Sequence, residues 1–257
     1  MKRVTFDQLG LWQFEILSQE PAIRHFVTDR NSYSFDDTFT LSYSSTPDTA
    51  KVRVNRQLLA SAMQVDEHHL VFPSQVHQTN IVHVTAGTTK DDVQETDALI
   101  TFEKNLCIAV MSADCVPIIL YDKKNMVVAA VHSGWRGTVA RILEKTLHEM
   151  HMKFGTVGSD LLAGIGPSVS QDAYEVGEEV IQSVQHTFGR ESDLMIHHSA
   201  GKARLDLWKA NKLQLLEFSV PEGQIEIADL CTVKNNNHFF SARKGDTGRF
   251  AAGIMVL

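Results

Sequence analysis

The sequence predicts one α+β domain spanning residues 1–257, in which helices pack on a buried mixed β-sheet. Its length of 257 residues is compatible with a single domain, and no repeat, low-complexity run or Gly/Ser/Pro-rich linker divides the chain. Short apolar runs and amphipathic segments are interleaved without a strict strand–helix–strand alternation. This pattern favours a mixed α+β domain.

The composition is that of a globular protein and narrows the classes of partner. Apolar residues make up 43% and charged residues 21% of the chain, close to the globular average. The net charge of −7 argues against nucleic acid or an anionic membrane as partner, although a local basic pocket for a small anion is compatible with it. Apolar stretches such as 126–131 fall far short of the ~18 residues of a membrane helix. The odd number of cysteines, three, is typical of a reducing compartment, so we expect a cytoplasmic protein.

The first half of the chain predicts a helix followed by four strands. The polar residues 42–48 form a predicted loop that caps a helix beginning near Thr49. Four Val- and Ile-rich runs follow, separated by turn-forming residues: 98–101, 106–111, 116–121 and 126–131. Because these runs are apolar throughout, we expect strands that are buried on both faces.

The second half predicts three helices and further strands. Residues 139–150 place their apolar side chains on one stripe, with Thr138 as the N-cap and Gly155 just beyond the end. The elements expected after this helix are a strand end shaped for close backbone approach at 164–168, helices after Gly177 and near Leu205, and strands at 224–230 and 251–257.

Three metal-competent residues lie at the edges of predicted strands: His77, Cys115 and His132. Two imidazoles and one thiolate suit Zn²⁺, and a catalytic zinc keeps three protein ligands with a fourth position open. The gaps of 38 and 17 residues (115 − 77 and 132 − 115) are unlike those of a zinc finger, so the fold itself has to assemble the site. Two alternatives use the same residues. Cys115 can act as a nucleophile with His132 or His77 as its base, or it can be an inert core residue.

Seven segments of the chain share one family resemblance. They read QVHQTNIV, DALIT, AVMSADCVPIILYD, VAAVHSGWRGT, GIGPSVSQDAYEVGEEV, ARLDLWKANKLQLL and FFSARKGDTGRFAA. Together they resemble the YfiH/DUF152 family, also called the multicopper polyphenol oxidase or laccase-like family, from about Gln75 to the carboxyl terminus, with a weaker trace over 24–59. The resemblance implies a zinc site formed by the His of QVHG, the Cys of ADC and the His of HAGWRG. Those residues are His77, Cys115 and His132 here.

The resemblance also implies an activity and a set of partners. Family members act on purine nucleosides, through phosphate-dependent cleavage of adenosine, inosine and methylthioadenosine and through deamination of adenosine. We therefore expect a zinc-dependent enzyme of the purine nucleoside phosphorylase or adenosine deaminase type, with a nucleoside and phosphate as its small-molecule partners. Attack of zinc-activated water at purine C6 would be the deamination. Cu²⁺ is the less expected metal, because the twelve histidines include no His-x-His pair of the kind that multicopper oxidases need.

The sequence departs from the family pattern at two places. Gln78 stands where the family has a glycine after the first histidine, so a tight turn there loses its usual residue. The amino-terminal Thr-Arg pair and glycine loop of the family are represented only by residues 28–34, where Arg30 matches the arginine and the glycines are missing. We therefore expect any difference in substrate contacts to lie in this region.

Further site residues follow from residue type and position. Asp114 is a candidate general base or a partner that orients a metal ligand, and Arg136 is a candidate phosphate holder near a helix start. The candidate substrate-binding residues are Arg30, Gln75, Tyr174 and Arg243. Structural alternatives exist: Asp114 can cap its turn, Arg136 can brace its loop through a carboxylate, and Tyr174 can be a buried tyrosine at a helix start. Arg243 and Arg249 flank one glycine-containing turn, and we expect one of them to face the pocket.

Two other functions are kept as alternatives. The same metal site can serve an amide hydrolase that acts on a cell-wall nucleotide precursor, which would need a pocket large enough for a nucleotide-sugar peptide. The chain can also be a zinc-bearing regulatory module with vestigial chemistry, in which case we expect a closed metal site without an open pocket.

Overall fold

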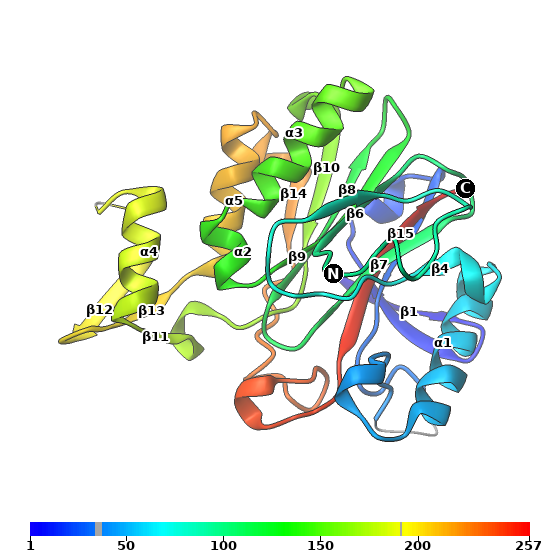
Figure 1. Ribbon diagram of the computed structural model, residues 1–257, viewed down its shortest axis with the longest axis horizontal. Helices are drawn as coiled ribbons and strands as arrows, with labels where there is room; N and C mark the ends of the chain where they lie inside the picture. Colours follow the sequence, from blue (N-terminus) through cyan, green and yellow to red (C-terminus); the bar gives the residue numbers. More distant parts are fainter. Residues whose placement is uncertain (34–37, 191) are drawn as a thin grey trace.

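The strands of the protein form more than one sheet. The computed structural model describes residues 1–33, 38–190 and 192–257. Within these residues there are two six-stranded mixed sheets and one three-stranded antiparallel sheet (Figure 1). The predicted α+β class, with helices packed on a mixed sheet, is confirmed, although the sheet is divided in two.

The elements have the following bounds. The first sheet contains, in spatial order, β1 (Lys2–Phe6), β2 (Leu9–Gln13), β3 (Ile23–Val27), β15 (Phe250–Val256), β7 (Cys107–Ser112) and β4 (Leu70–Val71). The second contains β14 (Ile225–Ile227), β10 (Leu161–Ile165), β8 (Val116–Asp122), β9 (Val127–Ser133), β6 (Ala98–Thr101) and β5 (Ile81–His83). The third contains β11 (Glu175–Gly177), β13 (Lys202–Leu205) and β12 (Met195–Ser199). The α-helices are α1 (Thr49–Met63), α2 (Trp135–Val139), α3 (Ile142–Phe154), α4 (Glu178–Phe188) and α5 (Leu207–Glu217).

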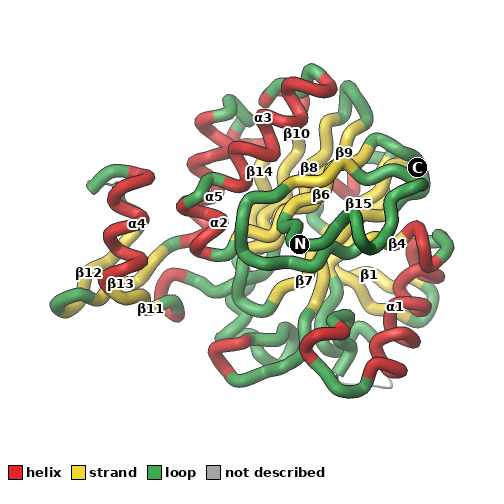
Figure 2. The backbone as a smooth tube through the Cα atoms, viewed as in Figure 1, coloured by secondary structure: helices red, strands yellow, loops and turns green. Residues whose placement is uncertain are grey.

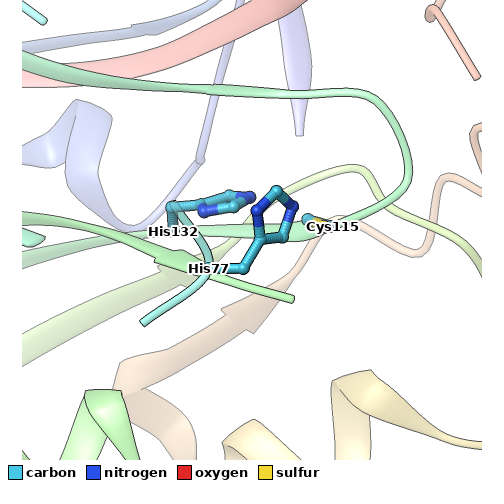
Figure 3. Close-up of side chains that lie close together, drawn as sticks. All are labelled: His77, Cys115 and His132. Carbon is cyan, nitrogen blue, oxygen red and sulfur yellow. The ribbon is translucent and has the colours of Figure 1, made fainter. Parts of the chain in front are cut away.

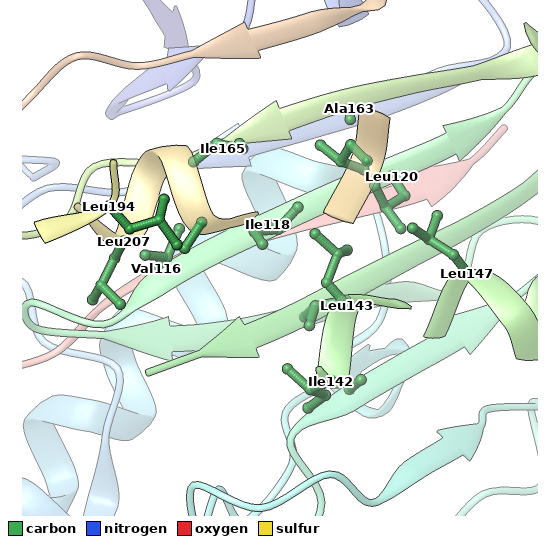
Figure 4. Close-up of a cluster of buried hydrophobic side chains, with 14 of the residues drawn as sticks. Val116, Ile118, Leu120, Ile142, Leu143, Leu147, Ala163, Ile165, Leu194 and Leu207 are labelled. Carbon is green, nitrogen blue, oxygen red and sulfur yellow. The ribbon is translucent and has the colours of Figure 1, made fainter. Parts of the chain in front are cut away.

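The two large sheets pack face to face and helices cover their outer faces, which gives four layers (Figures 1 and 2). Ile108 of β7 and Ile119 of β8 belong to the core between the sheets. Leu59 of α1 packs in the core on the outer face of the first sheet. Leu120 of β8 packs with Leu143 of α3 on the outer face of the second sheet (Figure 4). Successive residues of β7 and β8 therefore enter different cores, which explains their continuous apolar runs.

The four predicted strands are confirmed as β6, β7, β8 and β9. The last two pair in antiparallel register from Val116 opposite Ser133 to Asp122 opposite Val127. The carboxylate of Asp122 closes the turn between them by accepting hydrogen bonds from the amides of Lys124 and Asn125, both at 3.0 Å. The polar residues between the two runs therefore form the turn that their composition predicts.

The helix predicted to start at Thr138 begins elsewhere. The chain first forms the short helix α2, Arg141 then adopts a left-handed conformation with φ of 59°, and α3 begins at Ile142. The predicted N-cap is wrong because tertiary partners take the Thr138 hydroxyl, which lies 2.9 Å from Ser133 Oγ and accepts a hydrogen bond from Asn211 Nδ2. Gly155 is confirmed as the residue that ends the helix, with φ of 72°.

The other predicted helices are confirmed as α1, α4 and α5. Helix α1 begins at Thr49, where the Asp48 side chain accepts a hydrogen bond from the amide of Lys51 at 2.9 Å. Helix α4 and the three-stranded sheet form an extension at one side of the molecule (left in Figure 1). Among the helices that the structure describes, none has the length and apolar character needed to cross a membrane.

Phe14 joins the two large sheets at the glycine-rich end of β10. A Cβ atom at Gly164 would lie 2.6 Å from the Phe14 ring, so the predicted close approach at this strand end is confirmed. The backbone amide of Phe14 donates a hydrogen bond to Nε2 of His25, which is buried in β3. Burial lowers the pKa of His25 to about 4, and the acceptor role of Nε2 in this hydrogen bond requires that nitrogen to be unprotonated.

We expect the His25→Gln variant to lose part of the acid sensitivity of the wild-type protein. Between pH 6.5 and about 4 the unfolded chain protonates His25 while the folded chain does not, so wild-type stability falls with decreasing pH across this window, by up to about 3 kcal/mol. Glutamine keeps an acceptor for the Phe14 amide and does not titrate. Urea unfolding at pH 7 and pH 4 measures the two free energies. The exposed His186 supplies the control His186→Gln, and an equal loss of stability in wild type and His25→Gln would contradict the assignment.

Candidate metal centre

His77, Cys115 and His132 come from three separate segments and meet at one point (Figure 3). His77 precedes β5, Cys115 lies in the turn between β7 and β8, and His132 is near the end of β9. The ligand atoms of the three side chains all lie within 4.8 Å of one another. The imidazole rings have centroids 4.8 Å apart and stand nearly perpendicular, at 78°. The fold therefore assembles the donor set that the sequence could only suggest.

Asp97, which precedes β6, ties two of these ligands together. Its fully buried carboxylate lies 2.8 Å from Nδ1 of His132 through Oδ1. The same carboxylate accepts hydrogen bonds from the backbone amides of His77 at 3.0 Å and Gln78 at 2.8 Å. Because Nδ1 of His132 is engaged, Nε2 is the nitrogen left to bind a metal. Asp97 is the first residue of the segment DALIT, but its sequence context alone did not mark it as a site residue.

The electrostatic surroundings of Cys115 favour its thiolate form. Burial by itself raises the pKa of Cys115, but the neighbouring imidazoles of His132 and His77 outweigh it and lower that pKa. The Cys115 and Asp97 anions outweigh the opposite effect of burial on His132 and raise the pKa of its imidazole. Burial also opposes ionisation of Asp97, yet hydrogen bonds from His132 and the backbone keep its pKa below the usual value. A thiolate is the form of cysteine that binds metal.

Two backbone features shape the space around the sulfur. His77 adopts a left-handed conformation with φ of 63°, so the tight turn forms at the histidine itself. Gln78 needs no glycine and uses its amide to hold Asp97. Gly134, which precedes α2, packs so closely that a Cβ atom there would lie 2.8 Å from Cys115 Sγ and 3.3 Å from a ring carbon of His77. A side chain at residue 134 would therefore displace the thiol or the imidazole.

The three ligands lie in the wall of a cavity of about 620 Å³, a size typical of small-molecule sites. His77 is exposed, Cys115 is half-buried and His132 is buried, so the ligand cluster is accessible from the cavity side. The cavity also contains side chains from the loop before α1, from α1 itself and from the loop after β4. These include three cations, Arg56, Lys90 and Arg249.

Of the predicted additional site residues, Asp114 and Gln75 line this cavity. Asp114 has φ of 88°, and its carboxylate accepts hydrogen bonds from Thr232 Oγ1 at 2.6 Å and from the amide of Arg243 at 2.8 Å. Both of its oxygens are therefore engaged in holding the Cys115 turn. The side-chain amide of Gln75 exchanges two hydrogen bonds, at 2.7 and 2.8 Å, with the backbone of Met111.

The predicted arginines lie outside the set of residues that line the cavity. Arg30 donates to the carbonyl of Asn236 at 2.7 Å, and Ser34 at the end of its segment lies outside the described residues. Arg136 is exposed, with its guanidinium 4.4 Å from the centre of the Trp135 ring. The structural alternative for Arg136 was an ion pair with a carboxylate, but its guanidinium lies over the Trp135 ring instead. The substrate-binding role of these arginines stays a prediction.

Arg243 and Tyr174 form a pair that also stands apart from the cavity lining. The Arg243 guanidinium lies 4.6 Å from the centre of the Tyr174 ring and donates to the carbonyl of Glu175 at 2.9 Å. Tyr174 is buried, and burial is the main cause that raises its pKa to about 12. Of the two arginines that flank the glycine turn, Arg249 is the one that lines the cavity.

We expect Asp97→Asn to weaken zinc binding by about 10- to 100-fold, because the outer partner of His132 loses its charge. Zinc affinity is measured by competition with a chromophoric chelator. The matched control is Asp122→Asn, since Asp122 is also fully buried and accepts backbone amides but lies in the remote turn between β8 and β9. Equal zinc affinity of Asp97→Asn and wild type would show that Asp97 does not support the ligands.

Gly134→Ala should also weaken zinc binding, although it removes no ligand and its φ of −72° suits alanine. The added methyl group would stand 2.8 Å from Cys115 Sγ and force the sulfur away from the two imidazoles. Gly177→Ala is the control, because a Cβ atom there meets nothing within 4 Å. Chelator competition on both variants checks the prediction, and unchanged affinity in Gly134→Ala would refute the steric argument.

Comparison with known proteins places this chain in a family. Residues 24–257 match the family model described as multi-copper polyphenol oxidoreductase laccase. The chain is 40% identical over 257 residues to a protein of Bacteroides thetaiotaomicron named purine nucleoside phosphorylase, with 95% of each chain covered. It is 36% identical to adenosine deaminase RL5 from an unknown prokaryotic organism, with 80% of this chain and 82% of that protein covered.

Solved structures agree with the sequence comparison. The crystal structure of Bacillus licheniformis hypothetical protein YfiH matches with a TM-score of 0.89 at 28% identity, covering 98% of each chain. Neisseria meningitidis protein NMB0706, assigned to DUF152, matches with a TM-score of 0.83 at 26% identity, covering 97% of this chain and 99% of that one. The chain therefore belongs to the multi-copper polyphenol oxidoreductase laccase family, the YfiH/DUF152 family that its motifs resemble.

Proposed function

We propose that the protein is a zinc-dependent purine nucleoside enzyme. It cleaves adenosine, inosine or methylthioadenosine with phosphate to the free base and the ribose 1-phosphate, and it also deaminates adenosine. The observation that carries the proposal is the two-imidazole, one-thiolate cluster in the wall of an accessible small-molecule cavity. The names of two relatives, purine nucleoside phosphorylase and adenosine deaminase, support this substrate class.

The donor set fits zinc on its own chemistry. One sulfur and two nitrogens within 4.8 Å of one another are the borderline-soft ligands that zinc prefers. Zinc held by His77, Cys115 and His132 would supply Lewis-acid chemistry at an open fourth position. Among the described residues, no second group of three or more such ligands is close enough to hold an ion. Cu²⁺ is the less favoured metal, because multicopper oxidation needs several sites.

Phosphorolysis sets clear demands on the chain. An oxygen of hydrogenphosphate forms a bond to ribose C1′ while the bond from C1′ to the purine nitrogen breaks. The base leaves with that electron pair and takes up the proton of the hydrogenphosphate. The protein has to bind both partners, orient them and limit water. A rigid wall serves orientation, and the hydrogen bonds of Asp114 and Gln75 supply one.

The cavity argues against the two alternative functions. Its volume of about 620 Å³ suits a nucleoside with phosphate, whereas a cell-wall nucleotide precursor carries a sugar and a peptide in addition. A regulatory metal site would be closed, yet His77 is exposed and all three ligands line the cavity. Cys115 as a nucleophile needs one base, while both imidazoles converge on its sulfur. The arrangement therefore favours metal binding.

The purified protein should carry about one zinc per chain, and Cys115→Ala should lose it. Release of adenine from adenosine should require phosphate and fall at least ~100-fold in this variant, since a Lewis acid contributes several kcal/mol. Elemental analysis and chromatography of the products measure both. Cys231→Ser is the control, because Cys231 lies outside the ligand cluster and its buried sulfur accepts only a weak 3.4 Å hydrogen bond from the amide of Ser170. Zinc-loaded wild-type protein that forms neither adenine nor inosine would disprove the proposed function.

A further inference from the structure

The cavity that contains the metal ligands has an excess of positive charge. Among the residues that the structure describes, the charged side chains in its lining, apart from the ligands, are Arg56, Lys90, Arg249 and Asp114. Both carboxylate oxygens of Asp114 already accept hydrogen bonds, one from the Thr232 hydroxyl and one from the backbone amide of Arg243. Three cations therefore face the cavity in a chain whose net charge is −7. Such a local reversal of charge favours an anionic ligand.

Arg56, on α1, is held in one orientation. Its Nε donates a hydrogen bond to the carbonyl of Leu41 at 2.9 Å. The rings of Tyr43 and Phe72 lie 4.5 and 4.3 Å from its guanidinium carbon. With Nε engaged and both rings close to its central carbon, the guanidinium keeps its two terminal nitrogens for another acceptor. Arginine binds oxyanions through pairs of such nitrogens.

Arg56 has no carboxylate partner within ion-pair distance among the described residues, and the bond to Leu41 is its one hydrogen bond there. Burial lowers its pKa to about 10, partly opposed by Tyr43 and Glu67. Glu67 lies in the lining of a neighbouring hollow and is absent from the lining of the metal cavity. A partly buried cation without a counter-ion is costly to the fold unless a ligand compensates it.

Arg249 is attached to the same loop as Arg56. The backbone amide of Leu41 donates to the carbonyl of Arg249 at 3.2 Å, while the Leu41 carbonyl accepts from Arg56. The two arginines are thus anchored to opposite backbone groups of one residue. Nη1 of Arg249 is fixed by the carbonyls of Thr247 and Gly248 at 3.0 and 2.8 Å. The other two nitrogens of its guanidinium make no hydrogen bond within the described part of the chain.

Hydroxyl groups complete this part of the cavity. Ser42 and Ser44, one and three residues after Leu41, line the cavity and place their Oγ atoms 3.1 Å apart. Lys90 has an exposed side chain and also lines this cavity. Guanidinium groups, an ammonium group and hydroxyls are the usual donors to phosphate oxygens.

We propose that Arg56 and Arg249, with Ser42, Ser44 and Lys90, form the subsite that binds the phosphate co-substrate. This proposal rests on the proposed phosphorolysis and specifies where in the cavity its phosphate binds. Bound there, hydrogenphosphate shares one cavity with the metal ligands, as the attack of its oxygen on ribose C1′ requires. Arg56 and Arg249 then hold the phosphate, the role for which the sequence offered Arg136.

The test separates the phosphate from the nucleoside. Adenine release by zinc-loaded protein is measured against phosphate at saturating adenosine, and against adenosine at saturating phosphate. Arg56→Gln and Arg249→Gln should each raise the KM for phosphate by about tenfold or more, with the KM for adenosine changed less than about twofold. Lys90→Gln, at an exposed side chain, should raise the KM for phosphate by about threefold. Arg53→Gln is the matched control. Arg53 is exposed on α1, the helix that also contains Arg56, and its replacement changes the net charge by the same amount.

Two further readouts keep the outcomes distinct. Formation of inosine from adenosine uses water, so it should persist in all four variants. Calorimetric titration of inorganic phosphate into the zinc-loaded protein should show binding to wild type and to Arg53→Gln. The same titration should show loss of binding in Arg56→Gln and Arg249→Gln. Thermal unfolding and zinc content show whether each variant is folded. If Arg56→Gln does not fold, Arg249→Gln and Lys90→Gln decide the question.

The possible failures differ in meaning. Phosphate-dependent adenine release with an unchanged KM for phosphate in folded variants overturns this subsite and leaves the proposed function intact. A raised KM for adenosine alone also overturns it, because the cations would then hold the nucleoside. Absence of phosphate-dependent release by wild type overturns phosphorolysis. In that case the calorimetric titration still shows whether the cavity binds phosphate.

Discussion

The buried carboxylate of Asp97 is the interaction on which the metal centre depends. It gathers the backbone amides of His77 and Gln78 and the Nδ1 atom of His132 at distances of 2.8 to 3.0 Å. Its own backbone carbonyl also accepts from the amide of His132 at 2.7 Å. His77 and His132 are 55 residues apart (132 − 77), and the same buried carboxylate holds both of them in place. The charge is costly to bury, and these hydrogen bonds are what stabilise it.

The packing of the two sheets provides the third ligand. The turn between β7 and β8 passes from the first sheet to the second, and Cys115 lies in this turn. The second sheet pairs β8 with β9, so the sulfur is brought beside His132. Gly134 leaves the sulfur room, and Asp114 fixes the turn to the segment that contains Thr232. The site is therefore a product of the sheet interface more than of any single loop (Figure 3).

Charge in this protein is organised locally. The chain as a whole is acidic, yet the cavity beside the candidate metal ligands is lined by Arg56, Lys90 and Arg249. Aromatic rings shield Arg56, and its fixed orientation costs little entropy when an oxyanion binds. A metal held by the three candidate ligands and a basic wall in the same cavity would suit the proposed reaction between a neutral nucleoside and an anion. Overall charge alone would have given no hint of this.

The sequence by itself determined the features that depend on neighbouring residues. The apolar runs specified β6 to β9, polar and glycine residues marked α1 and the end of α3, and motif resemblance identified His77, Cys115 and His132. The tertiary structure decided everything that depends on partners distant in the chain. Thr138 is not a cap because Ser133 and Asn211 take its hydroxyl. Likewise, Asp97 acts on residues 20 and 35 positions away. Arginine side chains are long and flexible, so only the packed neighbours decide that Arg56 and Arg249 face the cavity while Arg136 does not.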